Sequence, residues 1–427
     1  MGQNELIPHL FRTEYRKIVS VLCARFGLGQ MEAAEDIASE TFLAAMQTWP
    51  LNGLPPHPVA WLYHVAKNKA RNYLQRESVY RGKIAPELRQ ADGAPGAGEA
   101  AIEGVEIDLS TANIEDSQLR MMFAICHPSI PTEAQIGLSL RILCGFGIEE
   151  IADAFLTNKA TINKRLFRAR ERLREEKVDI VVVDAREVEG RLPAVLTTIY
   201  LLFTEGYYSV PRDGVAFTKA SATEGMRSEL CYEAMRLCRM LIDNPLTDQP
   251  AVNALLALMC FHASRLDARV GVQGELVVYA DQEVSRWDAE LISEGAYFMR
   301  RSASGAVLTK YHLEANIAYW HCVKEDSEEK WENILQLYNH LLQLEYSPVA
   351  ALNRTYALAR VRGNAVALLE AEKLKLTTNP YYFALLGELH AGTDAGKARI
   401  CYEHAASLAK SEADRQALMK KIVGSGR

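Results

Sequence analysis

The sequence has little of what marks a membrane, secreted or metal-dependent protein. No apolar run approaches the length needed to span a bilayer, and no basic-then-apolar signal sequence opens the chain. The eight cysteines are scattered, without a CxxC pair or a Cys/His cluster at metal-ligand spacing. We therefore expect a cytoplasmic protein with free thiols, no metal, no cofactor and no membrane partner.

Strand-like patterns are also scarce, and the overall charge is not that of a general polyanion binder. The formal net charge is −6 over 427 residues, of which 49% are hydrophobic. This composition is typical of a soluble globular chain, and its length predicts roughly two to four domains. Glycine and proline fall between segments with helical apolar spacing, so we expect an all-α fold.

The most informative pattern is a helix, a short turn and a second helix over residues 149–177. The turn falls at Leu156, Thr157 and Asn158, and either Thr157 or Asn158 can cap the helix that follows. Apolar residues of the second helix recur at helical spacing and predict one buried face: Ile162, Leu166, Ala169 and Leu173.

The other faces of this second helix are basic. They carry the following side chains: Lys159, Lys164, Arg165, Arg168, Arg170, Arg172 and Arg174. A helix-turn-helix with such a second helix suits the negative potential of a DNA major groove. The competing interpretation is a solvated basic face on an ordinary surface helix.

Three amphipathic helices are expected earlier, over 11–26, 33–49 and 58–76, and Pro58 suits a helix start. The third helix mixes basic, amide and aromatic groups on its exposed side: Lys67, Asn68, Lys69, Arg71, Asn72 and Tyr73. Basic groups hold phosphates, and aromatic or amide groups stack on or bond to exposed bases. The helix therefore suits partly melted DNA, unless it is an ordinary amphipathic surface helix.

These segments resemble bacterial RNA polymerase sigma factors of the extracytoplasmic-function (ECF) type, in the sigma-70 family. The segment DIASETF followed by WLYHVAKNKARNYLQRE is similar to region two of these factors. The segment ATINKRLFRARERLRE lies where the recognition helix of region four is expected. The resemblance covers roughly the first 180 residues. It implies a protein that binds core RNA polymerase and directs it to promoter DNA.

The resemblance also implies roles for particular residues. The second helix, on which we expect exposed carboxylates at Glu35, Asp36 and Glu40, would dock on the β′ clamp through Asp36, Ser39, Glu40 and Phe42. The six residues of the third helix given above would meet the minus-ten element. Region four would contact the β flap and read the minus-thirty-five element through these residues: Lys159, Thr161, Asn163, Lys164, Arg165 and Arg168.

The rest of the chain is similar to a subgroup of sigma factors with a helical extension related to tetratricopeptide (TPR) repeats. Segments that carry this likeness include YLLFTEGYYS, ELCYEAMRLCRML and DQEVSRWD. Late in the chain Leu386-Gly387 is followed by Ala398, Tyr402 and Ala405, the last three at repeat spacing. Such helix pairs stack into a solenoid, which is a candidate site for a protein or peptide ligand.

The expected organisation has five parts. Residues 1–78 form the region-two domain, 79–114 a flexible acidic linker, and 115–178 the region-four domain. Residues 185–300 form a helical adapter, and 301–427 the TPR-like repeats. The sequence leaves open whether the extension inhibits the sigma domains or supports them.

The polar residues of the second half show no nucleophile–base pair, so no enzyme is expected. The segment DQEVSRWD is a candidate domain latch, made of Asp281, Arg286, Trp287 and Asp288. There Arg286 would pair with Asp281 or Asp288, and Trp287 would anchor a domain contact. The alternative is that the segment is a hot spot for a protein partner. Two other functions stay open: a helix-turn-helix regulator that acts without polymerase, and a TPR-type interaction adaptor.

Overall fold

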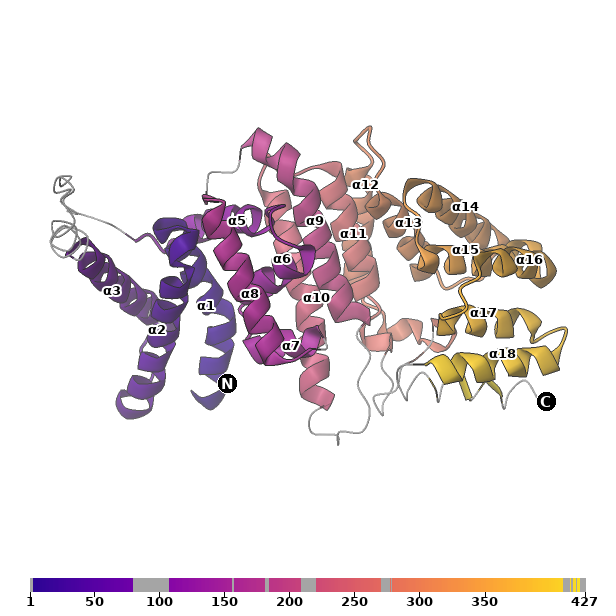
Figure 1. Cartoon of the computed structure of the whole chain (residues 1–427), viewed down its shortest axis with the longest axis horizontal. Coiled ribbons are helices and arrows are strands. Elements are labelled where there is room, and N and C mark those ends of the chain that lie inside the picture. The colour runs from indigo at the N-terminus through magenta and orange to yellow at the C-terminus, as the bar shows by residue number, and fades with distance from the viewer. Residues whose placement is uncertain are drawn as a thin grey trace. The chain divides into compact units, whose positions relative to one another are not determined.

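The computed structural model of the chain describes residues 3–79, 107–155, 157–180, 184–208, 220–269, 277, 279–409, 415, 418–419 and 421–422. The chain divides into two compact units, Met1–Thr198 and Ile199–Arg427. Every regular element in the described part is a helix, so the predicted all-α fold is confirmed (Figure 1).

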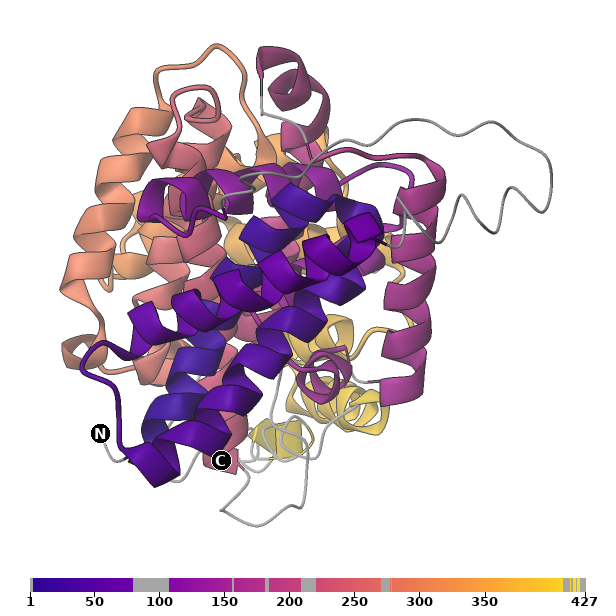
Figure 2. The same cartoon turned by 90° about the vertical axis from the view of Figure 1, so that its left-hand side faces the viewer.

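The first unit begins with three helices, α1 (Gln3–Phe26), α2 (Met31–Asn52) and α3 (Pro58–Val79). All three are longer than the sequence pattern predicts. They pack on one another around fully buried apolar side chains such as Leu22 and Leu62, and Figure 2 looks onto them.

A tight turn joins α1 to α2. Gly27 ends α1 with φ at 85°, a conformation that favours glycine, and its N–H donates to the carbonyl of Cys23 at 2.8 Å. The single 3₁₀ turn η1 (Leu28–Gln30) follows and leads directly into α2. This short turn matters below because α8 packs against it.

After these three helices, the described part of the first unit up to residue 175 consists of four helices and one π-helical turn. They are α5 (Thr111–Ile125), α6 (Thr132–Leu138), η3 (Ser139–Leu143), α7 (Ile148–Ala154) and α8 (Lys159–Glu175). Here α5 and η3 pack on α1, while α8 packs on α6, α7 and η1. The two predicted sigma regions therefore lie against each other within one unit.

The predicted linker, 79–114, needs correction at both ends. Val79 belongs to α3 and residues 111–114 belong to α5, because Ser110 caps that helix by accepting from the N–H of Asn113. Residues 80–106 of the predicted linker lie outside the described part of the chain.

Helix α9 (Ala185–Tyr208) carries the chain from the first unit into the second. Its first half packs in the first unit, where Arg191 donates to the carbonyl of Phe123 at 3.4 Å. Near the boundary the hydroxyl of Thr198 lies 3.3 Å from the side-chain oxygen of Gln135.

The first part of the second unit is built around α11 (Pro250–Ala263), whose side chains are nearly all buried. Helices α10 (Ala220–Asp243), α12 (Ala289–Ser302) and α13 (Lys310–Cys322) pack around it. The described residues between α11 and α12 include three single 3₁₀ turns: η4 (Asp267–Arg269), η5 (Tyr279–Asp281) and η6 (Val284–Arg286).

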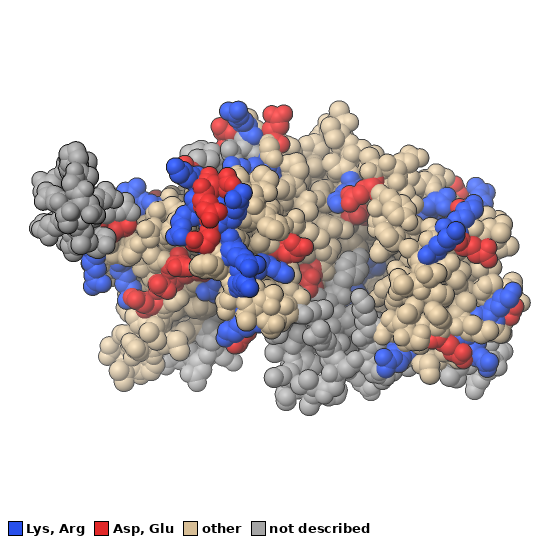
Figure 3. Space-filling view, viewed as in Figure 1, with Lys and Arg blue, Asp and Glu red and all other residues tan. Residues whose placement is uncertain are grey.

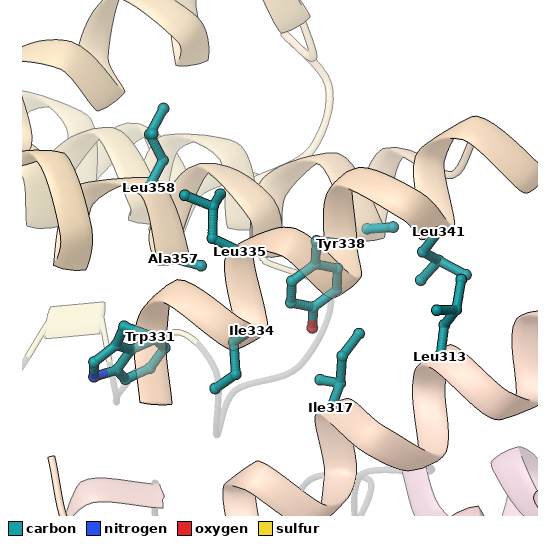
Figure 4. Packing of buried hydrophobic residues seen from close by; sticks show 10 residues of the cluster. Leu313, Ile317, Trp331, Ile334, Leu335, Tyr338, Leu341, Ala357 and Leu358 are labelled. Carbon is teal, nitrogen blue, oxygen red and sulfur yellow. The ribbon is translucent and has the colours of Figure 1, made fainter. Parts of the chain in front are cut away.

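Up to residue 409 the described chain continues with five more helices, and each packs against the next in the chain. They are α14 (Glu328–Leu344), α15 (Pro348–Arg362), α16 (Asn364–Leu374), α17 (Pro380–His390) and α18 (Ala395–Leu408). One core joins α13, α14 and α15, with Ile334, Tyr338 and Leu341 of α14 between their neighbours (Figure 4).

Candidate nucleic-acid and polymerase interface

Helix α8 has a local start signal and one buried face. The side chain of Asn158 accepts a hydrogen bond from the backbone N–H of Thr161 at 2.8 Å, which caps the helix. Ile162, Leu166, Ala169 and Leu173 are all buried, as their spacing predicts. Of the predicted turn residues, Leu156 lies outside the described part of the chain.

Basic residues of α8 line a pocket of about 550 Å³ beside the turn that leads into α6. Thr161, Lys164, Arg165, Arg168 and Arg172 all contribute to it. Cations gathered around a concavity attract phosphate or another anion. Figure 3 shows blue basic side chains, interspersed with acidic ones, over the part of the molecule where Figure 1 places α8.

Three predicted minus-thirty-five residues differ in their surroundings. The Lys159 ammonium lies 2.6 Å from the carboxylate of Glu149, and this contact lowers the pKa of the exposed Glu149 side chain. Asn163 is exposed, and the Arg165 guanidinium lies over the ring of Phe155 at 5.3 Å. Lys159 and Arg165 are therefore engaged by neighbouring side chains, whereas Asn163 faces solvent.

Glu35, expected at the surface of α2, is instead buried at 7% exposure. One of its carboxylate oxygens accepts from Nε of Arg141 at 2.8 Å, and the other lies 2.8 Å from Nη2 of Arg170. Arg141 belongs to η3 and Arg170 to α8, so the expectation of an exposed Glu35 is wrong. A buried carboxylate needs partners of this kind, and here they come from the predicted region-four segment.

Arg141 is itself held by several groups. Its guanidinium donates to the carbonyl of Phe146 and to the hydroxyl of Tyr15, each at 3.2 Å. Burial raises the pKa of Tyr15 to about 12, although the nearby Arg141 charge opposes that shift. The Tyr15 hydroxyl therefore stays protonated at neutral pH.

The predicted minus-ten surface on α3 is partly engaged within the protein. Lys69 pairs with Glu40 of α2 at 2.7 Å, and Asn68 lies 3.0 Å from a ring nitrogen of His64. Tyr73 is half-buried: its hydroxyl donates to Gln30 of η1 at 2.7 Å and its ring contacts Phe26. Lys67 is half-buried as well, whereas Arg71 and Asn72 are exposed.

The predicted polymerase surface on α2 needs one correction. Asp36, Ser39 and Glu40 are exposed, but Phe42 is only 3% exposed and meets the ring of Phe11 edge-on at 5.0 Å. Phe42 is therefore a core residue, because it shares the buried stripe of α2 that also includes Ala45.

Sequence reasoning missed two apolar residues on the exposed side of α2. Leu43 is 52% exposed and Met46 is 57% exposed, and both follow the exposed carboxylate of Glu40 on the same helix. Their position three residues apart, off the buried stripe, was the available signal. Exposed apolar groups beside carboxylates are typical of a protein-docking surface.

The four residues of the predicted latch lie in or directly beside the turns η5 and η6 and the start of α12. Trp287 is buried in the second unit and stacks on Tyr279, with ring centroids 6.2 Å apart. Asp288 caps α12 by accepting from the N–H of Leu291 at 2.9 Å. Asp281 and Arg286 are exposed, and the latch remains a prediction.

The cysteines of this chain are free, and most of them are buried. Within the described residues no group of three or more His, Cys, Asp or Glu side chains is arranged to hold a metal ion. All eight cysteines are free, and burial raises the pKa of Cys126 to about 11. None of the described helices is long and apolar enough to cross a bilayer.

Comparison with known protein families assigns two segments of the chain. Residues 10–79 match the family model for sigma-70 region 2, so α1, α2 and α3 form a domain of that type. Residues 191–303 match a "Family of unknown function (DUF6596)". No solved structure matches the chain.

Curated relatives fall into two groups. "Uncharacterized protein R00370" of Rhizobium meliloti is 32% identical over 388 residues, which cover 90% of this chain and 88% of that protein. "RNA polymerase sigma-H factor" of Pseudomonas aeruginosa is 29% identical over 37% of this chain and 79% of its own length. "ECF RNA polymerase sigma-E factor" of Escherichia coli is 28% identical over 32% of this chain and 69% of its own length.

Proposed function

This chain belongs to the same family as the Rhizobium meliloti protein R00370, and we propose that it is an ECF-type sigma factor. It binds core RNA polymerase and directs it to promoters, and the sigma-70 region 2 match over residues 10–79 carries this proposal. Catalysis of transcription stays with the core enzyme, and the protein acts in the cytoplasm, where the polymerase and the DNA are.

The polymerase-binding surface is the exposed side of α2. Polar contacts come from Asp36, Ser39 and Glu40. Apolar surface that becomes buried on docking comes from Leu43 and Met46. The partner is the clamp of the β′ subunit. Phe42 supports this surface from below through its packing in the core.

The DNA-binding surfaces are α3 and α8. Lys67, Lys69 and Arg71 hold phosphates of the minus-ten element, beside Asn68, Asn72 and Tyr73. A base leaves the helical stack only where protein contacts compensate for unstacking, and the ring of Tyr73 is suited to that role once it leaves Phe26.

Region four is the α5–α8 segment, and α8 is its recognition helix. Thr161, Asn163 and Lys164 in the first turns of α8 reach base edges of the minus-thirty-five element, since such helices enter the groove by their N-terminal end. Arg165, Arg168 and Arg172 surround the pocket beside α6 and hold backbone phosphate. The same segment contacts the β flap of the polymerase.

The C-terminal extension is a helical adapter over residues 185–300 followed by TPR-like repeats over 301–427, and it regulates or supports the sigma domains. The consecutive packing of its helices and the buried Ala398, Tyr402 and Ala405 support this assignment. A protein or peptide is the kind of ligand such helix pairs bind. Trp287 and its neighbours hold the extension's own fold together.

The test is run-off transcription by the full-length protein with core RNA polymerase on the DNA upstream of its own gene. A stable complex and a discrete transcript are expected. Arg168→Ala should weaken transcription, while the exposed Lys397→Ala in α18 should not. Specific DNA binding that needs no polymerase would favour a helix-turn-helix regulator, and a protein that binds neither would favour an interaction adaptor.

A further inference from the structure

The strongest unexplained feature of the first unit is a buried cluster of opposite charges. Side chains of Glu35, Arg141 and Arg170 are only 10%, 18% and 17% exposed. Removing such charges from water is costly, so the cluster exists because the three groups satisfy one another. Each oxygen of Glu35 contacts a different arginine, and each of these distances is 2.8 Å.

The cluster joins segments that the proposed function assigns to different tasks. Glu35 lies one residue before Asp36 on the polymerase-binding helix, while Arg170 lies on the recognition helix. A second contact accompanies it: a β-carbon added to Gly29 of η1 would lie 3.8 Å from Cδ of Arg174 on α8. The recognition helix is therefore docked on the region-two domain along its C-terminal half.

This docked arrangement brings the two DNA-binding surfaces too close together for a promoter. Arg170 forms an ion pair with Glu35, and Lys69 forms one with Glu40. The two glutamates are five residues apart on α2. Side-chain lengths and the helical rise then place the α-carbons of Arg170 and Lys69 at most about 40 Å apart. The minus-ten and minus-thirty-five elements lie about 70–85 Å apart along B-form DNA, at about 3.4 Å per base pair.

We propose that Glu35, Arg141 and Arg170 form an autoinhibitory lock that holds the sigma domains closed. The inference rests on the proposed function, because the closed state matters only if both surfaces must reach one promoter. In the closed state the protein contacts one element or neither. Opening requires that α8 and η3 leave Glu35, after which Arg170 is free to hold DNA phosphate.

The lock is built so that it can open. The Nε atom of Arg170 is buried and finds no hydrogen-bond partner among the described residues, so this guanidinium is incompletely satisfied by them in the closed state. Phosphate offers it several acceptor oxygens and a full negative charge. Core polymerase acts on the same helix, because its docking surface begins at Asp36, next to Glu35.

The test uses the full-length protein with two added cysteines, Gly29→Cys and Arg174→Cys, and a short cross-linker that a reductant cleaves. Closed molecules cross-link. Glu35→Gln keeps the size of the side chain but removes the charge, so the two arginines then repel each other. We expect Glu35→Gln to lower the cross-linking yield about five-fold or more, and the exposed Glu32→Gln on the same helix to leave it unchanged.

Transcription provides the second readout. The cross-linked protein should give no run-off transcript with core polymerase, and reductant should restore it. Without a cross-link, Glu35→Gln should raise promoter affinity by about 5- to 150-fold, the range of typical coupling between two sites. If Glu35→Gln fails to fold, the reversible cross-link alone decides, because it needs no change at the lock.

The outcomes separate the two proposals. An unchanged cross-linking yield in a folded Glu35→Gln protein, or full transcription by the cross-linked protein, overturns the lock. A third outcome is that Glu35→Gln lowers the cross-linking yield but the protein never supports transcription, even when open. This outcome upholds the lock as a closing contact and overturns the sigma assignment.

Discussion

Lys69 of α3 and Glu40 of α2 form an ion pair, with Nζ and Oε2 2.7 Å apart. The lysine belongs to the proposed minus-ten surface and the glutamate to the proposed polymerase surface. One ammonium cannot hold both this carboxylate and a DNA phosphate at full strength. When Glu40 turns to the polymerase, Lys69 is therefore released for DNA, which couples the two binding events.

Lys69→Gln should weaken promoter binding by the holoenzyme and reduce its salt dependence. One lost phosphate contact lowers the slope of log K against log salt concentration by about 0.9. The ion pair is partly exposed, so the free energy of unfolding should change by less than about 1 kcal/mol. Lys17→Gln, which breaks the pair with the buried Glu14 on α1, removes an equally exposed lysine outside the proposed DNA surface, so it is the control and should leave the slope unchanged.

Local features of this chain could be predicted from the sequence, and contacts between distant segments could not. The start of α8 follows from the Asn158 cap and from apolar spacing, both of which lie within a few residues. The burial of Glu35 depends on Arg141 and Arg170, more than a hundred residues away, and no spacing rule links them. A carboxylate looks exposed until its partners are known.

The mistake at Phe42 has a related cause. The docking surface and the buried stripe lie on different faces of the same helix, α2. Adjacent residues point to different faces, so an assignment that is one residue off places a buried side chain on the surface. Phe42 faces Phe11 in the core, while its neighbour Leu43 faces solvent. The structure leaves the predicted polar residues Asp36, Ser39 and Glu40 exposed and buries the predicted apolar one, Phe42.

Phe42→Ala and Leu43→Ala should therefore fail in different ways. Phe42→Ala leaves a cavity between α1 and α2 and should lower the free energy of unfolding by about 3–5 kcal/mol. Leu43→Ala should change that free energy by less than about 0.5 kcal/mol, yet weaken binding to core polymerase. Chemical denaturation and a pull-down with core enzyme measure the two effects, and the reverse pattern would refute both assignments.

In the second unit, Gly387→Ala should destabilise the packing of α17 on α18. An added β-carbon would come within 2.7 Å of ring carbon Cε1 of the buried Tyr402, whose hydroxyl is bonded to Glu388. Overpacking of this kind costs about 1–3 kcal/mol, only partly offset by the better helix propensity of alanine. Gly392→Ala is the matched control, because nothing lies within 4 Å of its added carbon. Equal melting temperatures for the two variants would contradict the close contact.

The stability of the second unit should fall as pH rises towards neutrality, because of Glu314. Burial raises the pKa of this carboxyl from 4.5 to about 7, against the opposing Lys310 charge. The folded protein therefore binds the proton more tightly than the unfolded chain. Protonated Glu314 stabilises the fold fully below about pH 4.5, and this stability is lost as pH rises through about 7. The free energy of unfolding falls by at most about 3 kcal/mol, because each unit of pKa difference corresponds to about 1.36 kcal/mol.

Glu314→Gln should flatten the dependence of unfolding free energy on pH in denaturation experiments between about pH 4.5 and pH 7. The exposed Glu325→Gln should leave it as steep as in the parent protein. A Glu314→Gln curve with the parent slope would show that Glu314 is charged in the folded state, and would shift the explanation to another group.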